Sequence, residues 1–189
     1  MQVTRLAIPD VLQLVPRRHH DDRGWFCETW QHGSLEAQGI RSDWLQDNHC
    51  FSARAGTLRG LHFQLPPNTQ TKLVRCLRGA VFDVSVDVRL GSPSYGQWVG
   101  VELSADNGRQ LLIPAGFAHG YLTLVAGCEV LYKVDAPWSP ADEVALAWDD
   151  PDIGVAWPDL GQPPLLSPRD DAAPRLAGFA SPFRYASAG

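Results

Sequence analysis

One run of strict alternation between apolar and polar residues limits the fold of this chain more than any other feature. The alternating residues are Phe82, Asp83, Val84, Ser85, Val86, Asp87, Val88 and Arg89. A period of two is that of a β-strand, because successive side chains point to opposite faces. We therefore expect a strand with one face packed on the core and the other face either wet or functional.

Similar short segments follow along the chain. Further strands are expected over 97–103, 109–113, 119–124 and 128–134. The phrases SADNG and VAG between them suit antiparallel turns, and 17 glycines and 15 prolines interrupt the apolar runs. The sequence therefore predicts an all-β sandwich or jelly roll, formed by residues 1–189 as one domain.

Little helix is expected. Residues 34–39 could form a short helix with Ser34 as N-cap, and residues 139–143 could make a single turn. The tail after Trp157 is rich in proline, alanine and aspartate, so we expect it to wrap the barrel irregularly.

Composition excludes some classes of function. The net charge of −5 argues against nonspecific nucleic-acid binding. The sequence has no signal-peptide pattern and no apolar run that approaches a membrane span, so a soluble, cytoplasmic protein is expected. The four cysteines are scattered without a CxxC pair, which favours reduced thiols over disulfides or a zinc site.

Five titratable residues lie in distinctive phrases and together suggest proton transfer. They are His62, Lys72, His119, Tyr132 and Asp170. A base, an acid and cations on or beside strands can be held rigidly, which suits chemistry at a carbon acid. The residues alone leave simpler interpretations open. His62 could be a half-buried histidine bonded to a backbone carbonyl, and Tyr132 a core tyrosine.

Strand phase bears on whether these residues meet. His119 and Tyr121 share one face of their strand, and Val130 and Tyr132 share one face of the next. If both faces point into the barrel, they line a cavity. Arg59 and His62 would lie on opposite faces by strict alternation, so both reach one pocket only if the strand bends or bulges between them or one of them lies at the mouth.

The ordered set of phrases at 21–30, 45–67, 72–124, 131–143 and 148–158 resembles the dTDP-4-dehydrorhamnose 3,5-epimerase family of the cupin-like jelly-roll superfamily. The resemblance implies a jelly roll, a homodimer, no metal or organic cofactor, and no nucleic-acid or membrane partner. It also implies the reaction: inversion of C3 and C5 of dTDP-4-dehydro-6-deoxy-D-glucose to give dTDP-4-dehydro-L-rhamnose.

The resemblance assigns roles to the four catalytic candidates. The hydrogens on C3 and C5 both lie next to the C4 ketone. Removal of either one gives an enolate, which can be reprotonated on the opposite face. His62 matches the family's base and Asp170 the partner that orients it. Tyr132 matches the opposing acid. Lys72 matches a position where an ammonium stabilises the enolate oxygen. The residues alone would instead favour an ordinary exposed lysine at the start of a strand.

The resemblance also implies a substrate-binding set. Arg59 and Arg23 match positions that bind the diphosphate, and Trp138 matches an aromatic that stacks on thymine. Other ligand-contacting positions correspond to Glu28, Gln46, Asp47, Asn48, His119, Tyr121, Glu143 and Arg169. In this family an N-terminal strand is shared across the dimer, which would bring Arg23 and Glu28 into the partner's pocket.

Three departures from the family pattern stand out. His19 and His20 replace a typical Phe-Gly pair, and Arg169 keeps the charge of a common lysine. Tyr121 replaces a common phenylalanine beside the expected sugar site. Its added hydroxyl bears on whether C3, C5 or both are epimerised, so a single-centre epimerase of a related dTDP-4-keto sugar remains an alternative.

Two other classes of function are weighed against the epimerase. The phrase IPAGFAH (113–119) resembles the second motif of metal-dependent cupins, but Gly60 stands where their first motif needs a histidine. His62 and His119 alone are too few ligands for such a site. A non-catalytic sugar-nucleotide-binding module is opposed by the joint presence of His62, Lys72, Tyr132 and Asp170, and a turnover assay would decide.

Overall fold

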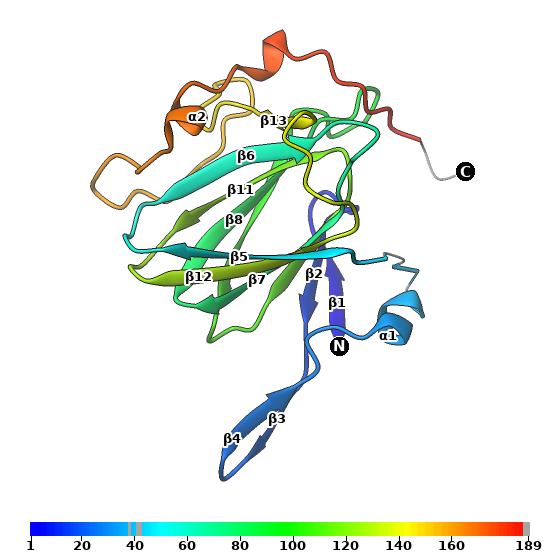
Figure 1. Ribbon diagram of the computed structural model, residues 1–189, viewed down its shortest axis with the longest axis vertical. Helices are drawn as coiled ribbons and strands as arrows, with labels where there is room; N and C mark the ends of the chain where they lie inside the picture. The colour runs from blue at the N-terminus through cyan, green and yellow to red at the C-terminus, as the bar shows by residue number, and fades with distance from the viewer. Residues whose placement is uncertain (38, 41–42, 187–189) are drawn as a thin grey trace.

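The computed structural model describes residues 1–37, 39–40 and 43–186, and most of its regular structure is β-strand. Two antiparallel sheets face each other (Figure 1). In spatial order, the six-stranded sheet contains β1 (Gln2–Arg5), β2 (Leu12–Val15), β10 (Gln110–Ile113), β7 (Lys72–Arg78), β12 (Cys128–Val134) and β5 (Gln46–Ser52). The five-stranded sheet contains β13 (Glu143–Ala145), β6 (Leu58–Gln64), β11 (Phe117–Thr123), β8 (Ala80–Asp87) and β9 (Trp98–Ser104). The all-β sandwich predicted from the sequence is confirmed.

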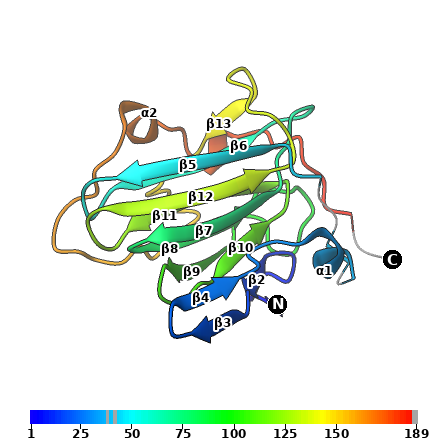
Figure 2. The same cartoon turned by 60° about the horizontal axis from the view of Figure 1, so that its bottom comes forward.

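A separate hairpin, β3 (Arg18–Asp21) with β4 (Gly24–Cys27), projects away from the sandwich (Figures 1 and 2). It carries two exposed aromatic side chains, Trp25 at 51% and Phe26 at 67% exposure. Large apolar side chains gathered on a projecting element are typical of a surface that another molecule covers.

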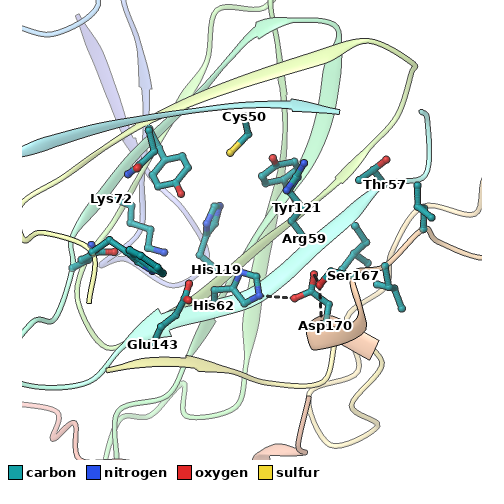
Figure 3. Close-up of a pocket in the computed structure, with 17 residues that line it drawn as sticks. Cys50, Thr57, Arg59, His62, Lys72, His119, Tyr121, Glu143, Ser167 and Asp170 are labelled. Atoms are coloured by element: carbon teal, nitrogen blue, oxygen red, sulfur yellow. Dashed lines mark hydrogen bonds and ion pairs between the residues drawn. The ribbon is translucent and has the colours of Figure 1, made fainter. Parts of the chain in front are cut away.

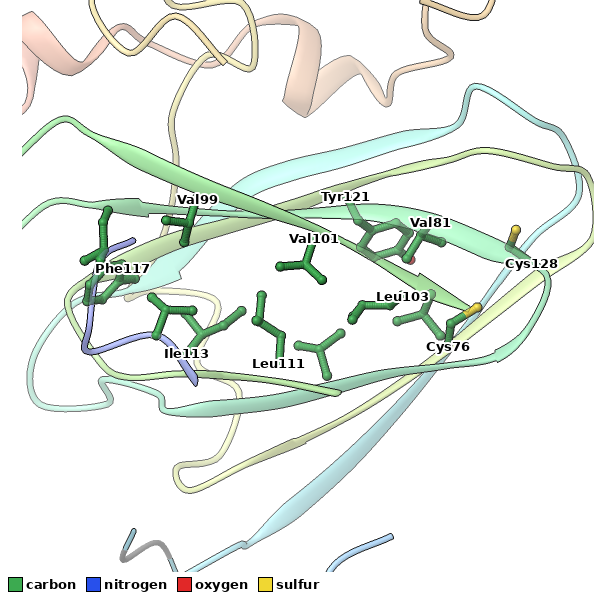
Figure 4. Packing of buried hydrophobic residues seen from close by; sticks show 14 residues of the cluster. Cys76, Val81, Val99, Val101, Leu103, Leu111, Ile113, Phe117, Tyr121 and Cys128 are labelled. Carbon is green, nitrogen blue, oxygen red and sulfur yellow. The ribbon is translucent and has the colours of Figure 1, made fainter. Parts of the chain in front are cut away.

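The main core lies between the two sheets. Its buried side chains come from both layers, among them Val99 and Val101 from β9 facing Leu111 and Ile113 from β10 (Figure 4). A second cluster lies on the outer face of the five-stranded sheet, where Leu61 and Val84 pack with the later residues 146, 153 and 176. The tail therefore covers this sheet from outside, as expected for a segment that wraps the barrel.

The alternating strand β8 decides between the two roles expected for its polar face, wet or functional. Its apolar residues, such as Val84 and Val86, pack under the tail, and its polar residues Asp83, Ser85 and Asp87 point into the barrel with no exposed surface. The polar face is therefore buried and not wet. A buried carboxylate needs hydrogen-bond or charge partners, so this strand brings polar chemistry to the interior.

Element boundaries agree with the expected ones within a few residues. The strand expected over 119–124 begins earlier, at Phe117, because Phe117 and Ala118 also pair with β8. The helix expected over 34–39 is α1 (His32–Glu36), and its N-cap is Gln31, which accepts a hydrogen bond from the backbone N–H of Ser34 at 2.5 Å. Gln38 of the expected range lies outside the described residues.

The later helical segments are short. Residues 140–142 form the expected turn, and Glu143 already belongs to β13. The tail contains α2 (Pro168–Asp171) and a 3-10 turn, Leu176–Gly178, neither of which was expected. Among the described residues, no helix has the length and apolar character needed to cross a membrane.

Candidate active site

A cavity of about 480 Å³ opens between the sheets. Its walls come from β5, β6, β7, β11 and β12, and residues 165–167 and 170 close one side (Figure 3). The cavity brings together ten of the residues singled out from the sequence: His62, Lys72, Tyr132, Asp170, Asn48, Arg59, His119, Tyr121, Trp138 and Glu143. Charged, polar and aromatic side chains thus converge on a space large enough for a small ligand.

A bulge in β6 explains how Arg59 and His62 both reach this cavity. On β11, Tyr121 pairs with Arg59 and His119 pairs with His62, so β6 has one more residue than β11 over this stretch. Gly60 lies inside the bulge with φ +133°, where an added Cβ would lie 2.5 Å from the Cα of Gly120. Only glycine fits this position. The bulge considered from strand phase is confirmed.

His62 is held by a carboxylate from the tail. Its Nε2 lies 2.5 Å from Oδ1 of Asp170, and the Ser167 hydroxyl donates to Oδ2 of the same carboxylate at 2.8 Å. Burial acts to raise the pKa of Asp170, but hydrogen bonds from His62 and Ser167 outweigh it and keep that pKa below its ordinary value. The imidazole therefore faces the cavity beside a fixed negative charge.

A second histidine is held in the same way. The Nε2 of His119 lies 2.9 and 3.0 Å from the two carboxylate oxygens of Asp83, which has no exposed surface. His119 is also the direct cross-strand partner of His62. Sequence reasoning did not identify Asp83 or Ser167 as site residues. Asp83 had one usable signal, its place on the polar face of the alternating strand.

Lys72 begins β7 and is buried in the cavity wall, so the interpretation as an exposed lysine is wrong. Burial lowers the pKa of Lys72 to about 8, against the opposing effect of the Glu143 and Asp83 carboxylates. Its Nζ lies 5.9 Å from the centre of the Tyr132 ring on β12. A cation and a phenol therefore stand together in the wall formed by the six-stranded sheet.

Tyr132 keeps its proton at neutral pH. Burial raises the pKa of Tyr132 to about 12, and the neighbouring Cys50 and Glu143 act in the same direction. A phenol in this state can give a proton but does not carry a charge of its own. Because β12 and β6 belong to opposite sheets, Tyr132 and His62 approach the cavity from different sides.

Polar and aromatic side chains surround these residues. Arg59 is exposed and hydrogen-bonds the Ser52 hydroxyl at 3.4 Å and the Phe51 carbonyl at 3.2 Å. Trp138 is 55% exposed, and its backbone N–H donates to the Gln46 side chain at 3.1 Å. An exposed indole and a guanidinium are suited to a flat base and an anionic group.

Five predicted ligand-contacting residues do not line the cavity of the single chain. The Gln46 side chain donates to Asn48 at 2.7 Å and accepts from the Trp138 backbone N–H at 3.1 Å, and Asp47 accepts from the Lys133 ammonium at 2.9 Å. Arg169 forms an ion pair with Glu143 and donates to its carbonyl at 3.0 Å. Arg23 and Glu28 are exposed, at and just after the projecting hairpin.

The donor set does not suggest a metal centre. Among the residues that the structure describes, no three His, Cys, Asp or Glu side chains are grouped as a metal-binding site would require. The four cysteines are free thiols. The acids and bases of the cavity are instead arranged as separate pairs, which suits proton transfer.

Comparisons with known proteins cover most of the chain. The sequence profile of the dTDP-4-dehydrorhamnose 3,5-epimerase family matches residues 5–178. The enzyme of that description from Pseudomonas aeruginosa is 52% identical over 171 residues, which cover 90% of this chain and 93% of the relative.

Two solved structures are also similar to this chain in sequence and in fold. The crystal structure of a dTDP-6-deoxy-D-glucose-3,5-epimerase from Legionella pneumophila, in complex with dTDP-4-keto-L-rhamnose, is 42% identical and superposes with a TM-score of 0.94 over 98% of this chain and 99% of that chain. A 3'-monoepimerase from Streptomyces bikiniensis in complex with dTDP-quinovose is 37% identical, with a TM-score of 0.84 over 91% of this chain and 86% of that chain.

Proposed function

This chain belongs to the dTDP-4-dehydrorhamnose 3,5-epimerase family and is an isomerase, and we propose that its cavity inverts C3 and C5 of dTDP-4-dehydro-6-deoxy-D-glucose. The observation that carries the proposal is the meeting of three groups in one cavity. These are the His62–Asp170 pair, the protonated Tyr132 and the buried Lys72. They supply the base, the acid and the cation that the reaction needs.

Proton removal is the first step. A hydrogen on a carbon next to the C4 ketone is acidic because the carbanion delocalises onto the ketone oxygen. His62 accepts this proton, and the Asp170 carboxylate stabilises the imidazolium that forms. Lys72 donates to the C4 oxygen as negative charge develops there, and its buried position strengthens that interaction.

Proton return on the other face completes the inversion. Tyr132 approaches from the opposite sheet and holds its proton at neutral pH, because burial raises its pKa to about 12. It gives that proton to the face of the enolate that His62 does not reach. His62 then releases its proton to solvent and Tyr132 takes one up, which restores both groups. C3 and C5 both flank the same ketone, so the restored base and acid serve both carbons when the ring presents each in turn.

In this proposal the nucleotide lies against Trp138, Arg59 and Asn48. Trp138 stacks on the thymine, and its exposed indole leaves a face free for a base. The guanidinium of Arg59 binds the diphosphate, and Asn48 hydrogen-bonds the nucleoside. Glu143 also lines the cavity, where Arg169 holds its carboxylate in place and its charge acts on Lys72.

A homodimer is the further part of the proposal. Arg23 lies in the turn of the projecting hairpin and does not line the cavity of its own chain. The aromatic residues Trp25 and Phe26 beside it are exposed. Burial of this hairpin against a second copy would remove that apolar surface from water and deliver Arg23 and Glu28 to the second cavity. The free thiols fit a reducing compartment, so we place the dimer in the cytoplasm.

Solvent exchange tests the reaction directly. The protein is incubated with dTDP-4-keto-6-deoxyglucose in D2O with a metal chelator, and NMR follows deuterium at C3 and C5. Deuterium at both carbons is the expected result. Deuterium at one carbon alone would instead support a single-centre epimerase, which the similarity to the 3'-monoepimerase keeps as the second candidate. Absence of exchange at both carbons would contradict the proposal.

A further inference from the structure

The loop of residues 135–142 joins β12 to β13 and carries Trp138. Trp138 lines the cavity and is 55% exposed, so packing around the indole holds it only in part. β13 pairs with the end of β6, where Glu143 is the cross-strand partner of Gln64, so the loop returns to the sandwich beside Gln64 (Figure 1). The position of the indole therefore depends on what holds the backbone of this loop.

Gln64 is a buried amide that the proposed mechanism does not use. It is 3% exposed and occupies the last position of β6. Its Nε2 donates to the carbonyls of Asn68 at 2.5 Å and Pro137 at 3.1 Å, and its Oε1 accepts from the backbone N–H of Ser139 at 2.7 Å. One side chain thus bonds the backbone on both sides of Trp138.

Trp138 itself is held by a second glutamine. Its backbone N–H donates to Oε1 of Gln46 at 3.1 Å, and Nε2 of Gln46 donates to Oδ1 of Asn48 at 2.7 Å. Residues 137, 138 and 139 therefore each have a backbone group bonded to a glutamine side chain. Hydrogen bonds of this kind fix the backbone from which a functional side chain projects.

The contacts of Gln64 require a primary amide of this length. Its partners are two carbonyls and one N–H, so a single buried group must supply two donors and one acceptor. An ionised glutamate has no donor, methionine has only a weak acceptor, and asparagine is one methylene shorter. Loss of the amide would leave buried backbone groups without partners and release the loop.

We propose that Gln64 is a positioning residue that holds Trp138 ready to stack on the nucleotide base. This inference rests on the proposed function, which assigns the stacking to Trp138. A loop that is ordered before the ligand arrives loses less conformational entropy on binding. Gln64 therefore raises the affinity for the nucleotide without touching it.

The Gln64→Met variant removes the amide and keeps an unbranched side chain of similar length. Binding of dTDP is measured by calorimetry on the full chain, and we expect the affinity to fall about threefold to tenfold, the usual entropic cost of immobilising one side chain. Solvent exchange at saturating substrate should stay within about twofold of the parent, because His62 is unchanged. Gln64→Asn keeps an amide that cannot span both loops, so it should show a loss in the same direction even if the methionine variant does not fold.

A double-mutant cycle separates positioning from a general loss of stability. In the Trp138→Ala background, replacement of Gln64 should leave the affinity for dTDP unchanged, because the ring that it positions is absent. An equal loss in both backgrounds would overturn the inference. Asp150→Ala is the matched control, since Asp150 is 1% exposed and its carboxylate accepts from two backbone N–H groups away from the cavity. This control should lose stability and keep the parent affinity.

Hydrogen exchange of the free protein tests the same contacts without a ligand. The backbone N–H of Ser139, which donates to Gln64, should exchange with D2O about tenfold faster in Gln64→Met than in the parent. Unchanged exchange at Ser139 would overturn the inference, and so would an unchanged affinity for dTDP. If the parent does not bind dTDP while Ser139 responds as expected, the proposed function is contradicted instead, so the two failures are distinguishable.

Discussion

His62 on β6 and His119 on β11 are direct cross-strand partners, and each imidazole is hydrogen-bonded to a different buried aspartate. The two are not equivalent. The side chain of His62 is 26% exposed to the cavity, whereas that of His119 is 7% exposed and lies deeper. Access therefore supports His62 over His119 as the imidazole in the proposed proton transfer, and His119 forms part of the cavity wall.

Replacing His62 by alanine should remove the base without removing the nucleotide site. We expect deuterium exchange at C3 and C5 to fall at least about 100-fold, because a positioned general base contributes on that order. Affinity for dTDP should stay within about twofold, since Trp138 and Arg59 are untouched. Exchange is followed by NMR and binding by calorimetry. His49→Ala, an exposed histidine paired with Glu129, is the control. Exchange that persists in the His62 variant would show that another group is the base.

Tyr132→Phe should separate the two halves of the reaction. His62 survives in this variant, so C–H exchange by return of a proton to the same face should fall less than about tenfold. Inversion needs the opposing donor and should fall on the order of 100-fold or more. Both rates come from one NMR experiment that follows deuterium entry and product configuration together. Equal losses in exchange and inversion would rule out the division of roles between His62 and Tyr132.

Replacement of Lys72 should raise the stability of the folded protein and lower its activity. Its pKa is lowered by burial from 10.5 to about 8, so below pH 8 the folded protein carries a buried charge that the unfolded chain would carry in water. The depression corresponds to about 3 kcal/mol of lost stability, present in full below pH 8 and relieved as the pH rises from 8 towards 10.5. Lys72→Met should therefore unfold at a higher urea concentration than the parent at pH 7, yet lose turnover.

The same pKa predicts the pH dependence of catalysis. Turnover of the parent should decline above about pH 8, as the ammonium that stabilises the enolate loses its proton. Asp83→Asn removes one of the charges that raise this pKa, so the decline should begin at lower pH in that variant. A pH–rate profile of both proteins provides the check, and identical alkaline limbs would argue against Lys72 as the titrating group.

Trp138→Ala should weaken nucleotide binding and spare the proton chemistry. Base stacking on an aromatic side chain contributes roughly 1–3 kcal/mol, so the affinity for dTDP should fall about 5- to 150-fold. Exchange at saturating substrate should stay within about threefold of the parent, because Trp138 does not touch the His62–Asp170 pair. Trp138→Phe should recover most of the lost affinity. If the alanine variant binds dTDP as tightly as the parent, the stacking assignment is incorrect.

Arg23 should act in the cavity of a second copy. Arg23→Ala and His62→Ala are each expected to be inactive alone, but their mixture forms dimers in which one cavity has both an intact His62 and a donated Arg23. About one quarter of the parent activity should return after subunit exchange, since half of the dimers are mixed and one of their two cavities works. If Arg23 served its own chain, every cavity would lack one of the two residues and the mixture would remain inactive.

Local patterns in the sequence predicted the strands from β8 to β12 well, because alternation and turn residues report on backbone conformation directly. The strand from Cys128 to Val134 was predicted with the boundaries that the structure has. The polar face of β8 was not predicted to be buried, because alternation shows that two faces differ but not which one turns inward. Its Asp83 was marked in the sequence only by its place on that polar face, and the contact with His119 became visible in the structure.

Prediction of the site required contacts between residues that are far apart in the sequence. The contact between His62 and Asp170 joins positions 108 residues apart, and no local pattern links them. Family resemblance supplied that pair, and strand phase supplied the condition that β6 must bulge near Gly60. Neither strand phase nor the structure of one chain assigns Arg23 and Glu28 to a cavity. Arg23 is in the β3–β4 hairpin and Glu28 follows it, and this hairpin projects away from the sandwich (Figure 1).

The position of Asp170 in the tail has a consequence for how activity arises during synthesis. The last sheet strand ends at Ala145, so a chain made only to that point contains every strand of the barrel and the imidazole of His62, but not the carboxylate that orients it. The reactive pair is assembled when the tail docks on the outer face of the finished sheet. A chain that ends before the tail therefore lacks both the side chains that cover the outer face of the five-stranded sheet and the carboxylate that holds His62.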